Sequence, residues 1–253
     1  MTRKSQMALP SLTSPLAKFA AAALGAAAIA APAQGATINF DAGAGMVFGS
    51  GDSWQEQGYN LTFEAYDPAD VDSLVGAIVD TSDPTYCIDM ACPINGQGGY
   101  YGAFNDSIVW VQSETAGASF MVKSIDASFI GLDAALGGYP IYSGLLRMQG
   151  FLADGSYILQ DLLLDGPSSQ GFLFGSYSPF ETFANTAFVS MAMFGFTCDD
   201  AGDCVAFDNN RGQFAIDNLV LDDALAEVPE PASLALFGLG FLGLAARARR
   251  RNA

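Results

Sequence analysis

Between residues 37 and 224 the chain is a succession of short apolar segments in which hydrophobic and polar residues alternate, separated by Gly, Asp, Asn and Pro. This alternation predicts β-strands, because successive side chains of a strand point to opposite faces. In residues 59–65, for example, Tyr59, Leu61 and Phe63 share one face. No segment before residue 228 combines helical periodicity, caps and sufficient length. The pattern predicts an all-β fold, an antiparallel β-sandwich of the jelly-roll-like kind, with the first and last strands close together.

The expected strand segments are 37–40, 59–65, 74–79, 107–113, 118–130, 141–152, 156–164, 183–196 and 213–221. Residues 80–101 are expected to form a loop. The apolar residues of segment 118–130 change face once, which predicts a bulge or bend near Ser124. Ala153-Asp154-Gly155 is expected to join two strands as a hairpin. The expected shared core consists of Phe40, Phe63, Val122, Ile125, Phe129, Ile158, Val189, Phe214 and Ile216.

The first 36 residues have the composition of a secretory signal peptide. Arg3, Lys4 and Lys18 precede an alanine-rich apolar stretch at 19–31, and small residues follow it. Ala31-Pro32-Ala33 fits the small-residue pattern of a cleavage site, and Ala36/Thr37 is the other candidate. A structural N-terminal helix is the alternative. Pro32 and Gly35 would end such a helix where cleavage is expected.

The last residues of the chain combine two prolines, an apolar run and a basic end. Pro229, Glu230 and Pro231 are followed by the nearly pure apolar segment 232–246. A helix of 15 residues would span about 22 Å, which is less than the ~30 Å of a bilayer's hydrocarbon core. Snorkelling and local thinning can cover the difference. The basic residues that should stay on the cytoplasmic side are Arg247, Arg249, Arg250 and Arg251.

This order of Pro-Glu-Pro, short hydrophobic helix and basic tail resembles the PEP-CTERM sorting signal. The resemblance covers about a tenth of the chain. It implies processing by an exosortase, a membrane enzyme, after transient anchoring in the inner membrane of a Gram-negative bacterium. The destination would be the cell surface or the extracellular matrix. The expected organisation is a signal peptide at 1–36, a sandwich domain at 37–224, and a linker with the sorting segment at 225–253. A plain tail anchor is the alternative.

The four cysteines form two local pairs, Cys87 with Cys92 and Cys198 with Cys204. In an exported protein such pairs predict two disulfides that each close a small loop. A zinc site is the competing interpretation. It lacks support because the chain has no histidine and neither pair has the two-residue spacing of a zinc knuckle.

The predicted exported part is strongly acidic. Residues 37–227 hold 26 Asp and Glu but only Lys123, Arg147 and Arg211 as basic residues, which gives a net charge of −23. Such a surface repels nucleic acid and anionic lipid headgroups, so neither is expected as a partner.

Gln213, Phe214 and Asp217 form a second, shorter pattern, similar to the Gln-Phe-x-x-Asp signature of one PEP-CTERM subgroup. The closing segment is also similar to carbohydrate-binding jelly rolls of exported proteins. In many of these, an Asp of the last strand and a carboxylate near the first strand hold a structural calcium. The resemblance points to Asp217 and Asp41 as calcium ligands, with backbone carbonyls completing the shell. The alternative is that both are ordinary surface carboxylates.

An enzyme is not expected, because a chain without histidine lacks Ser-His-Asp and Cys-His machinery. The preferred hypothesis is a structural or interaction protein associated with exopolysaccharide or biofilm. A carbohydrate-binding module is the alternative, in which exposed aromatic residues stack on sugar rings. A two-carboxylate glycosidase is less favoured, since no acidic pair stands out. The candidate stacking residues are Trp54, Trp110, Tyr100 and Tyr101, although Trp110 also fits a core position.

Overall fold

The structure is a computed structural model that describes residues 35–67, 73–87, 90–132, 136–208 and 210–224. The chain divides into units 1–33 and 34–253, and only the second contains described residues. The predicted signal peptide lies outside them except for its last two residues, and the sorting segment lies outside them entirely. No helix in the described part is both long and apolar enough to span a membrane.

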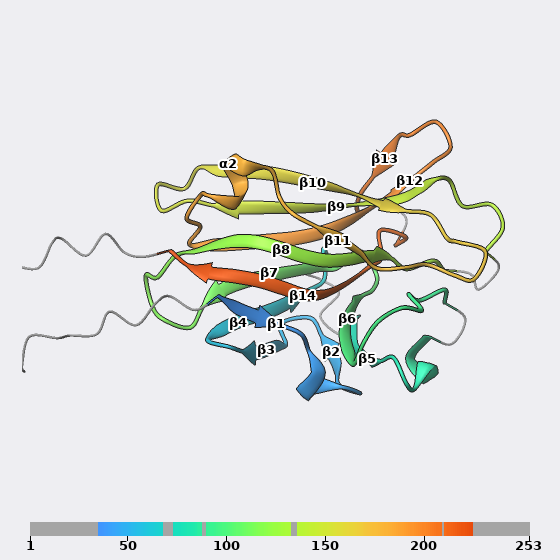
Figure 1. Cartoon of the computed structure of the whole chain (residues 1–253), viewed down its shortest axis with the longest axis horizontal. Helices are drawn as coiled ribbons and strands as arrows, with labels where there is room; N and C mark the ends of the chain where they lie inside the picture. Colours follow the sequence, from blue (N-terminus) through green and yellow to red (C-terminus); the bar gives the residue numbers. More distant parts are fainter. Residues whose placement is uncertain (1–34, 68–72, 88–89, 133–135, 209, 225–253) are drawn as a thin grey trace, which may run out of the picture. The chain divides into compact units, whose positions relative to one another are not determined.

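Two antiparallel seven-stranded sheets make up the fold (Figure 1). The first sheet has the strand order β11-β8-β14-β6-β5-β2, and β1 also pairs with β14. Its strands are β1 (Ala36–Ile38), β2 (Val47–Gly49), β5 (Leu74–Asp80), β6 (Gly99–Ala103), β8 (Phe120–Phe129), β11 (Gly175–Tyr177) and β14 (Phe214–Asp223).

The second sheet has the order β10-β9-β12-β7-β4-β3, and β13 pairs with β12. Its strands are β3 (Ser53–Glu56), β4 (Tyr59–Glu64), β7 (Ile108–Ser113), β9 (Tyr142–Phe151), β10 (Tyr157–Asp165), β12 (Ser190–Cys198) and β13 (Cys204–Val205). The predicted β9–β10 hairpin is confirmed, and Gly155 in its turn has a φ of 83°, which favours glycine. The predicted antiparallel sandwich is therefore confirmed.

β14 joins the two halves of the first sheet. It pairs with β8 along one edge, and along the other edge it pairs first with β6 and then with β1. The first strand thus lies beside the last, as the jelly-roll-like arrangement predicts (Figure 1). The β14–β8 register shifts on both sides of Val220, which is opposite Ser124. The irregularity predicted near Ser124 is confirmed.

As predicted, no long, capped helix occurs among the described residues before 228. Helix α2 (Glu181–Ala184) is a single α-helical turn that buries Phe183, and η1 (Asp41–Gly43) and η2 (Pro84–Cys87) are short 3₁₀ turns. Turns of three or four residues are too short to show a helical period. The strand predicted at 183–196 accordingly begins only at Ser190.

Most of the predicted core is confirmed. Phe40, Phe63, Val122, Ile125, Phe129, Phe214 and Ile216 are buried between the sheets. Ile158 is only partly buried, because β10 is an edge strand, and Val189 is half-buried just before β12 begins. The two layers meet where the ring of Phe63, from the second sheet, stacks on that of Tyr101, from the first, with 4.2 Å between centroids.

Strand β6 was not expected, because its residues were assigned partly to a loop. All five of its residues are buried, so it shows no alternation of apolar and polar side chains.

Gly76, on the neighbouring strand β5, lies against Tyr101: a Cβ at Gly76 would lie 2.2 Å from the Tyr101 hydroxyl oxygen. Glycine at this position therefore leaves room for the Tyr101 hydroxyl, which donates a hydrogen bond to the carbonyl of Val75 at 3.2 Å.

Candidate functional site

The outer side of the second sheet carries a group of aromatic side chains, here called the aromatic face. Strand alternation places them there: Val109, Val111, Met191 and Met193 point into the core, so the residues between them point outward. The register aligns the outward positions of β7, β12, β9 and β10. The aromatic face consists of Trp110, Phe151, Tyr157, Phe194 and Phe196.

The rings of the aromatic face form two connected rows. In the first row Trp110 lies 5.7 Å from Phe151, with 27° between the ring planes, and Phe151 lies 6.2 Å from Tyr157. In the second row Phe194 lies 5.7 Å from Phe196. Tyr157 is 57% exposed, whereas the other four are half-buried, so their rings remain accessible at the surface.

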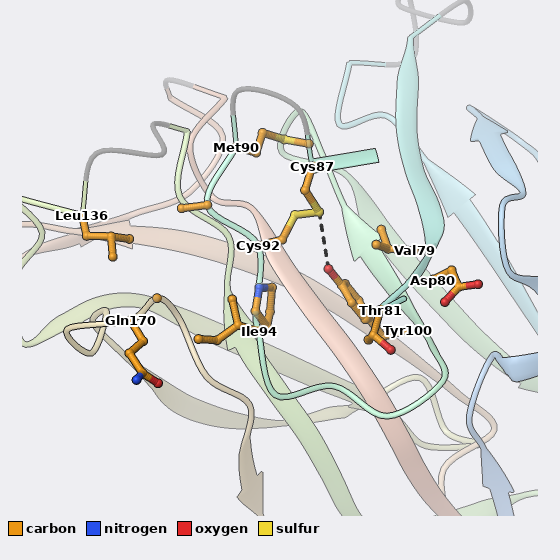
Figure 2. A pocket seen from close by; sticks show the side chains of 13 residues that line it. Val79, Asp80, Thr81, Cys87, Met90, Cys92, Ile94, Tyr100, Leu136 and Gln170 are labelled. Atoms are coloured by element: carbon orange, nitrogen blue, oxygen red, sulfur yellow. Dashed lines mark hydrogen bonds between the residues drawn. A yellow bond between two sulfur atoms is a disulfide. The ribbon is translucent and has the colours of Figure 1, made fainter. Parts of the chain in front are cut away.

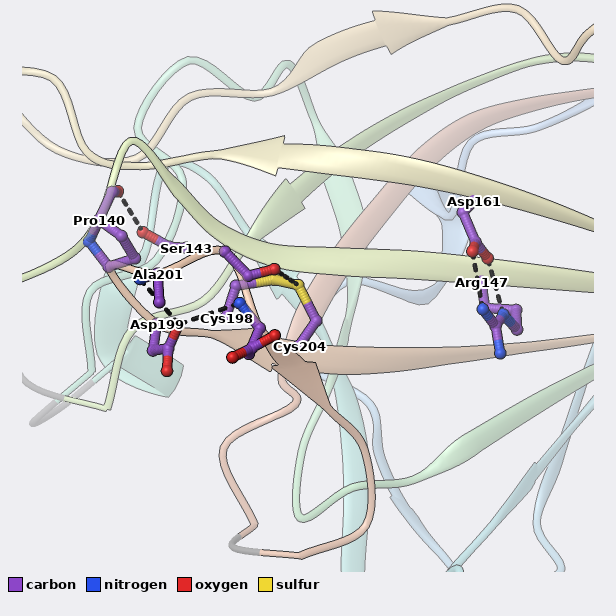
Figure 3. Close-up of a disulfide and its surroundings, with 10 residues drawn as sticks. Pro140, Ser143, Arg147, Asp161, Cys198, Asp199, Ala201 and Cys204 are labelled. Carbon is purple, nitrogen blue, oxygen red and sulfur yellow. Dashed lines mark hydrogen bonds and ion pairs between the residues drawn. A yellow bond between two sulfur atoms is a disulfide. The ribbon is translucent and has the colours of Figure 1, made fainter.

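Polar side chains are fixed between these rings. The Trp110 indole nitrogen donates a 2.9 Å hydrogen bond to Glu64 Oε2. The Arg147 guanidinium donates two 2.7 Å hydrogen bonds to the carboxylate of Asp161 on the neighbouring strand (Figure 3). These bonds raise the pKa of Arg147 above its ordinary value. The same guanidinium lies 4.9 Å from the centroid of the Phe196 ring, a cation–π distance.

This combination suits a flat, hydroxyl-rich ligand. Large exposed apolar surfaces on soluble proteins usually mark binding sites. Aromatic rings present flat apolar platforms, while the fixed carboxylate and guanidinium groups offer hydrogen bonds beside them. A pyranose ring has both an apolar C–H face and a rim of hydroxyls, so it can use both kinds of group at once.

A groove beside the second disulfide adjoins this surface. It has a volume of about 440 Å³ and is lined by Leu163, on the outer side of β10, and by Ile141, which is 83% exposed. Cys198 and Cys204 also line it and are disulfide-bonded, as predicted (Figure 3). The disulfide thus holds the loop between β12 and β13 in place at this end of the sheet.

Two of the four predicted stacking residues are placed wrongly. Tyr100 and Tyr101 are 1% and 0% exposed, because β6 is buried on both sides. Trp54 is half-buried, packs against the core and donates a 3.0 Å hydrogen bond to Glu56. Only Trp110 lies on the aromatic face.

Sequence reasoning missed the other four members of the aromatic face. The sequence signal for them is a strand whose inward and outward positions are both apolar. In residues 191–196, for example, Met191 and Met193 point inward, whereas Phe194 and Phe196 point outward. Such a strand resembles one buried on both faces. Among the described residues no further sheet packs over the second one, so the rings are exposed through a tertiary property that the strand pattern does not contain.

The loop over the first sheet is held by the other predicted disulfide, Cys87–Cys92 (Figure 2). It borders a hollow of about 430 Å³. The Tyr100 hydroxyl lies 3.6 Å from Cys87 Sγ, and the Thr81 hydroxyl donates to the carbonyl of Gly98 at 3.0 Å. Because these two hydroxyls are engaged with the protein, this hollow is a weaker ligand site than the aromatic face.

The predicted calcium ligands are Asp217, in β14, and Asp41, in η1. Asp217 is 3% exposed and sits where β14 leaves β6 and joins β1. Burial raises the pKa of Asp217 to about 7, and nearby carboxylates, including Asp126 and Asp41, add to this rise. Asp41 Oδ1 accepts a 2.9 Å hydrogen bond from the backbone nitrogen of Gly99.

In the described part of the chain, no three acidic, Cys or His side chains converge closely enough to hold a metal ion. Asp41 and Asp217 would therefore supply only part of a shell, with backbone oxygens for the remainder. Calcium binding stays a prediction. The other residues of the Gln-Phe-x-x-Asp pattern, Gln213 and Phe214, are 4% and 0% exposed, which gives this pattern a role in closing the sandwich.

The fold and face thus define a disulfide-bonded β-sandwich with an open aromatic surface. Residues 227–251 match the family model of the PEP-CTERM protein-sorting motif. This match confirms the predicted PEP-CTERM signal, over a range that includes Pro229, Glu230 and Pro231, and marks an exported protein. The two disulfides fit an extracytoplasmic location. The match does not extend to the Gln-Phe-x-x-Asp subgroup.

None of the curated proteins matches this chain. Among solved structures, a family 29 carbohydrate binding module is similar at 11% identity and a TM-score of 0.35, over 75% of this chain and 89% of that one. A DUF4465 family protein from Bacteroides ovatus is similar at 8% identity and a TM-score of 0.39, over 76% of this chain and 100% of that one. Similarity at this level carries no argument about function.

Proposed function

We propose that this chain is an exported surface or matrix protein that is processed by an exosortase and holds extracellular polysaccharide on its aromatic face. The observation that carries the proposal is the pairing of an open aromatic surface with a C-terminal sorting signal. The sorting signal marks a domain that is exported from the cytoplasm. Outside the cell, polysaccharide is an abundant ligand with flat apolar sugar faces and dense hydroxyls.

The size of the face fits a chain of several sugars better than a single one. The first row of rings runs across β7, β12, β9 and β10, and neighbouring strands lie about 4.8 Å apart. Three strand spacings correspond to roughly 14 Å, the length of a few sugar units. An extended glycan can therefore cross the strands and contact Trp110, Phe151 and Tyr157 in turn.

Binding is tested by presenting the exported protein to an array of extracellular polysaccharides. Tyr157→Ala removes the most exposed ring of the face and should weaken binding about tenfold, since one stacked ring contributes on the order of 1–2 kcal/mol. Ile94→Ala is a matched control: Ile94 is 54% exposed, on the loop over the other sheet. Equal binding by wild type and Tyr157→Ala would contradict the proposal.

Processing is tested by mass spectrometry of the protein recovered from the cell surface. We expect a chain that has lost the N-terminal segment up to Ala33 or Ala36 and the sorting segment after the Pro-Glu-Pro motif. Replacing Pro229 and Pro231 with alanine should leave the C-terminal segment attached. Recovery of the wild-type chain with both ends intact would contradict processing by an exosortase.

A further inference from the structure

We infer that the aromatic face selects uncharged glycans over glycans that carry carboxylate groups. This inference rests on the polysaccharide binding proposed above and narrows its ligand class. It follows from the ion pair that Arg147 forms with Asp161 and from the negative charge of the surrounding domain.

Arg147 is the only basic residue in the strands of the second sheet, all of which are described. Arginine is the side chain best suited to bind a uronate carboxylate, because its fork matches both oxygens. Here that fork is taken by Asp161, with Nε and one terminal nitrogen each 2.7 Å from a carboxylate oxygen (Figure 3). The guanidinium is also positioned over Phe196.

Asp161 offsets the charge of Arg147, so the net charge of the three ionised side chains beside the rings, those of Arg147, Asp161 and Glu64, is negative. Glu64 uses one oxygen to accept the Trp110 hydrogen bond and still carries its charge beside the first row of rings. The surrounding domain adds a strongly negative field, since residues 37–227 carry −23. A ligand carboxylate would meet repulsion, and in the described strands of the second sheet Arg147, already paired, is the only cation that could offset it.

Neutral sugars avoid this repulsion and can still use the polar groups. Their hydroxyls both donate and accept, so they can bond to the outer edge of the Arg147–Asp161 pair without breaking it. The pair thus acts as a neutral hydrogen-bonding unit between the rings. A uronate could reach only the outer N–H groups of Arg147, where Asp161 already offsets the positive charge and the negative field of the domain opposes a second carboxylate.

The test compares each neutral polysaccharide that binds the exported protein with its C6-oxidised counterpart, in which the primary alcohol has become a carboxylate. We expect oxidation to weaken binding by roughly tenfold or more at low ionic strength, because one charge–charge contact near a protein surface contributes over 1 kcal/mol. Added salt should reduce the difference.

Asp161→Asn tests the mechanism, because it releases Arg147 without a large change of shape. This variant should recover severalfold of the binding to the oxidised polymer. Glu181→Gln, which removes an exposed charge on α2 outside the aromatic face, should not.

Equal or tighter binding of the oxidised polymers by wild type would overturn the selectivity and leave the polysaccharide proposal standing. Selectivity that Asp161→Asn leaves unchanged would overturn the role of the ion pair. Binding of neither form, or binding insensitive to Tyr157→Ala, would overturn the proposed function and this inference with it.

Discussion

Trp110 and Phe151 stack with 5.7 Å between their ring centroids, although β12 lies between their strands. The outward residue of β12 at this level is Ala192, which is directly opposite Trp110. A small residue there leaves the two rings free to meet above it. The first row of rings is therefore continuous across the strands rather than a set of isolated side chains.

A double-mutant cycle measures this contact. Trp110→Ala and Phe151→Ala should show a coupling free energy of about 0.5–1.5 kcal/mol in thermal or urea unfolding, as aromatic pairs do. Phe180, which is 46% exposed, is a control, because it has no ring contact with Trp110. Trp110→Ala and Phe180→Ala should be additive within about 0.5 kcal/mol. Additivity for Trp110 and Phe151 as well would show that the two rings are independent in solution.

The core prediction concerns Phe214, which is fully buried at the start of β14. Phe214→Ala should lower the free energy of unfolding by about 3–5 kcal/mol, the usual cost of emptying a buried aromatic position. The exposed Phe180→Ala should change it by about 1 kcal/mol or less. Urea unfolding followed by circular dichroism provides the measurement. A Phe214→Ala protein that unfolds like wild type would place this ring outside the core.

The third prediction concerns the buried carboxylate of Asp217, whose pKa is raised from 3.8 to about 7 in the folded state. Because the folded state holds this proton more tightly, the resulting stability is present below pH 4 and is lost as the pH rises through 7. In chelator, wild type should therefore lose stability between about pH 4 and 7, and Asp217→Asn should lose less. Equal pH slopes would show that Asp217 titrates normally.

Calcium should reverse this loss if Asp217 and Asp41 are its ligands. At pH 8 and matched ionic strength, a ligand that binds only the folded state adds about 2.7 kcal/mol at a hundred times its dissociation constant. Wild type should then melt several degrees higher in calcium than in sodium chloride, and Asp217→Asn should lose that excess. Glu181→Gln serves as the charge control. Identical melting in both salts would make Asp217 an ordinary buried carboxylate.

Alternation predicts the sandwich well where one face is polar, as in β4 and in the β9–β10 hairpin. It fails for β6, whose five residues are all buried, and for α2, which is only four residues long. It also assigns Tyr100 and Tyr101 to a loop surface. Tyr100 is buried beneath the loop that the Cys87–Cys92 disulfide closes over the first sheet, whereas Tyr101 is buried between the two sheets.

The candidate site was less predictable than the fold. Trp110 was identified as a candidate, but its partners Phe151 and Tyr157 come from a hairpin about forty residues later. Only the strand order, with β12 inserted between β7 and β9, brings them together. Likewise, Arg147 is visible in the sequence as one of few cations, whereas its pairing with Asp161 depends on the hairpin register.

The most direct measurement uses Trp110 itself as the reporter. The chain has two tryptophans, so Trp54→Phe leaves the indole of the aromatic face as the only one. Titration of this variant with a neutral polysaccharide that binds should change the Trp110 emission saturably, with the same midpoint as binding, and should protect it from acrylamide quenching. A saturating ligand that leaves the emission and quenching of Trp110 unchanged would contradict binding on this face.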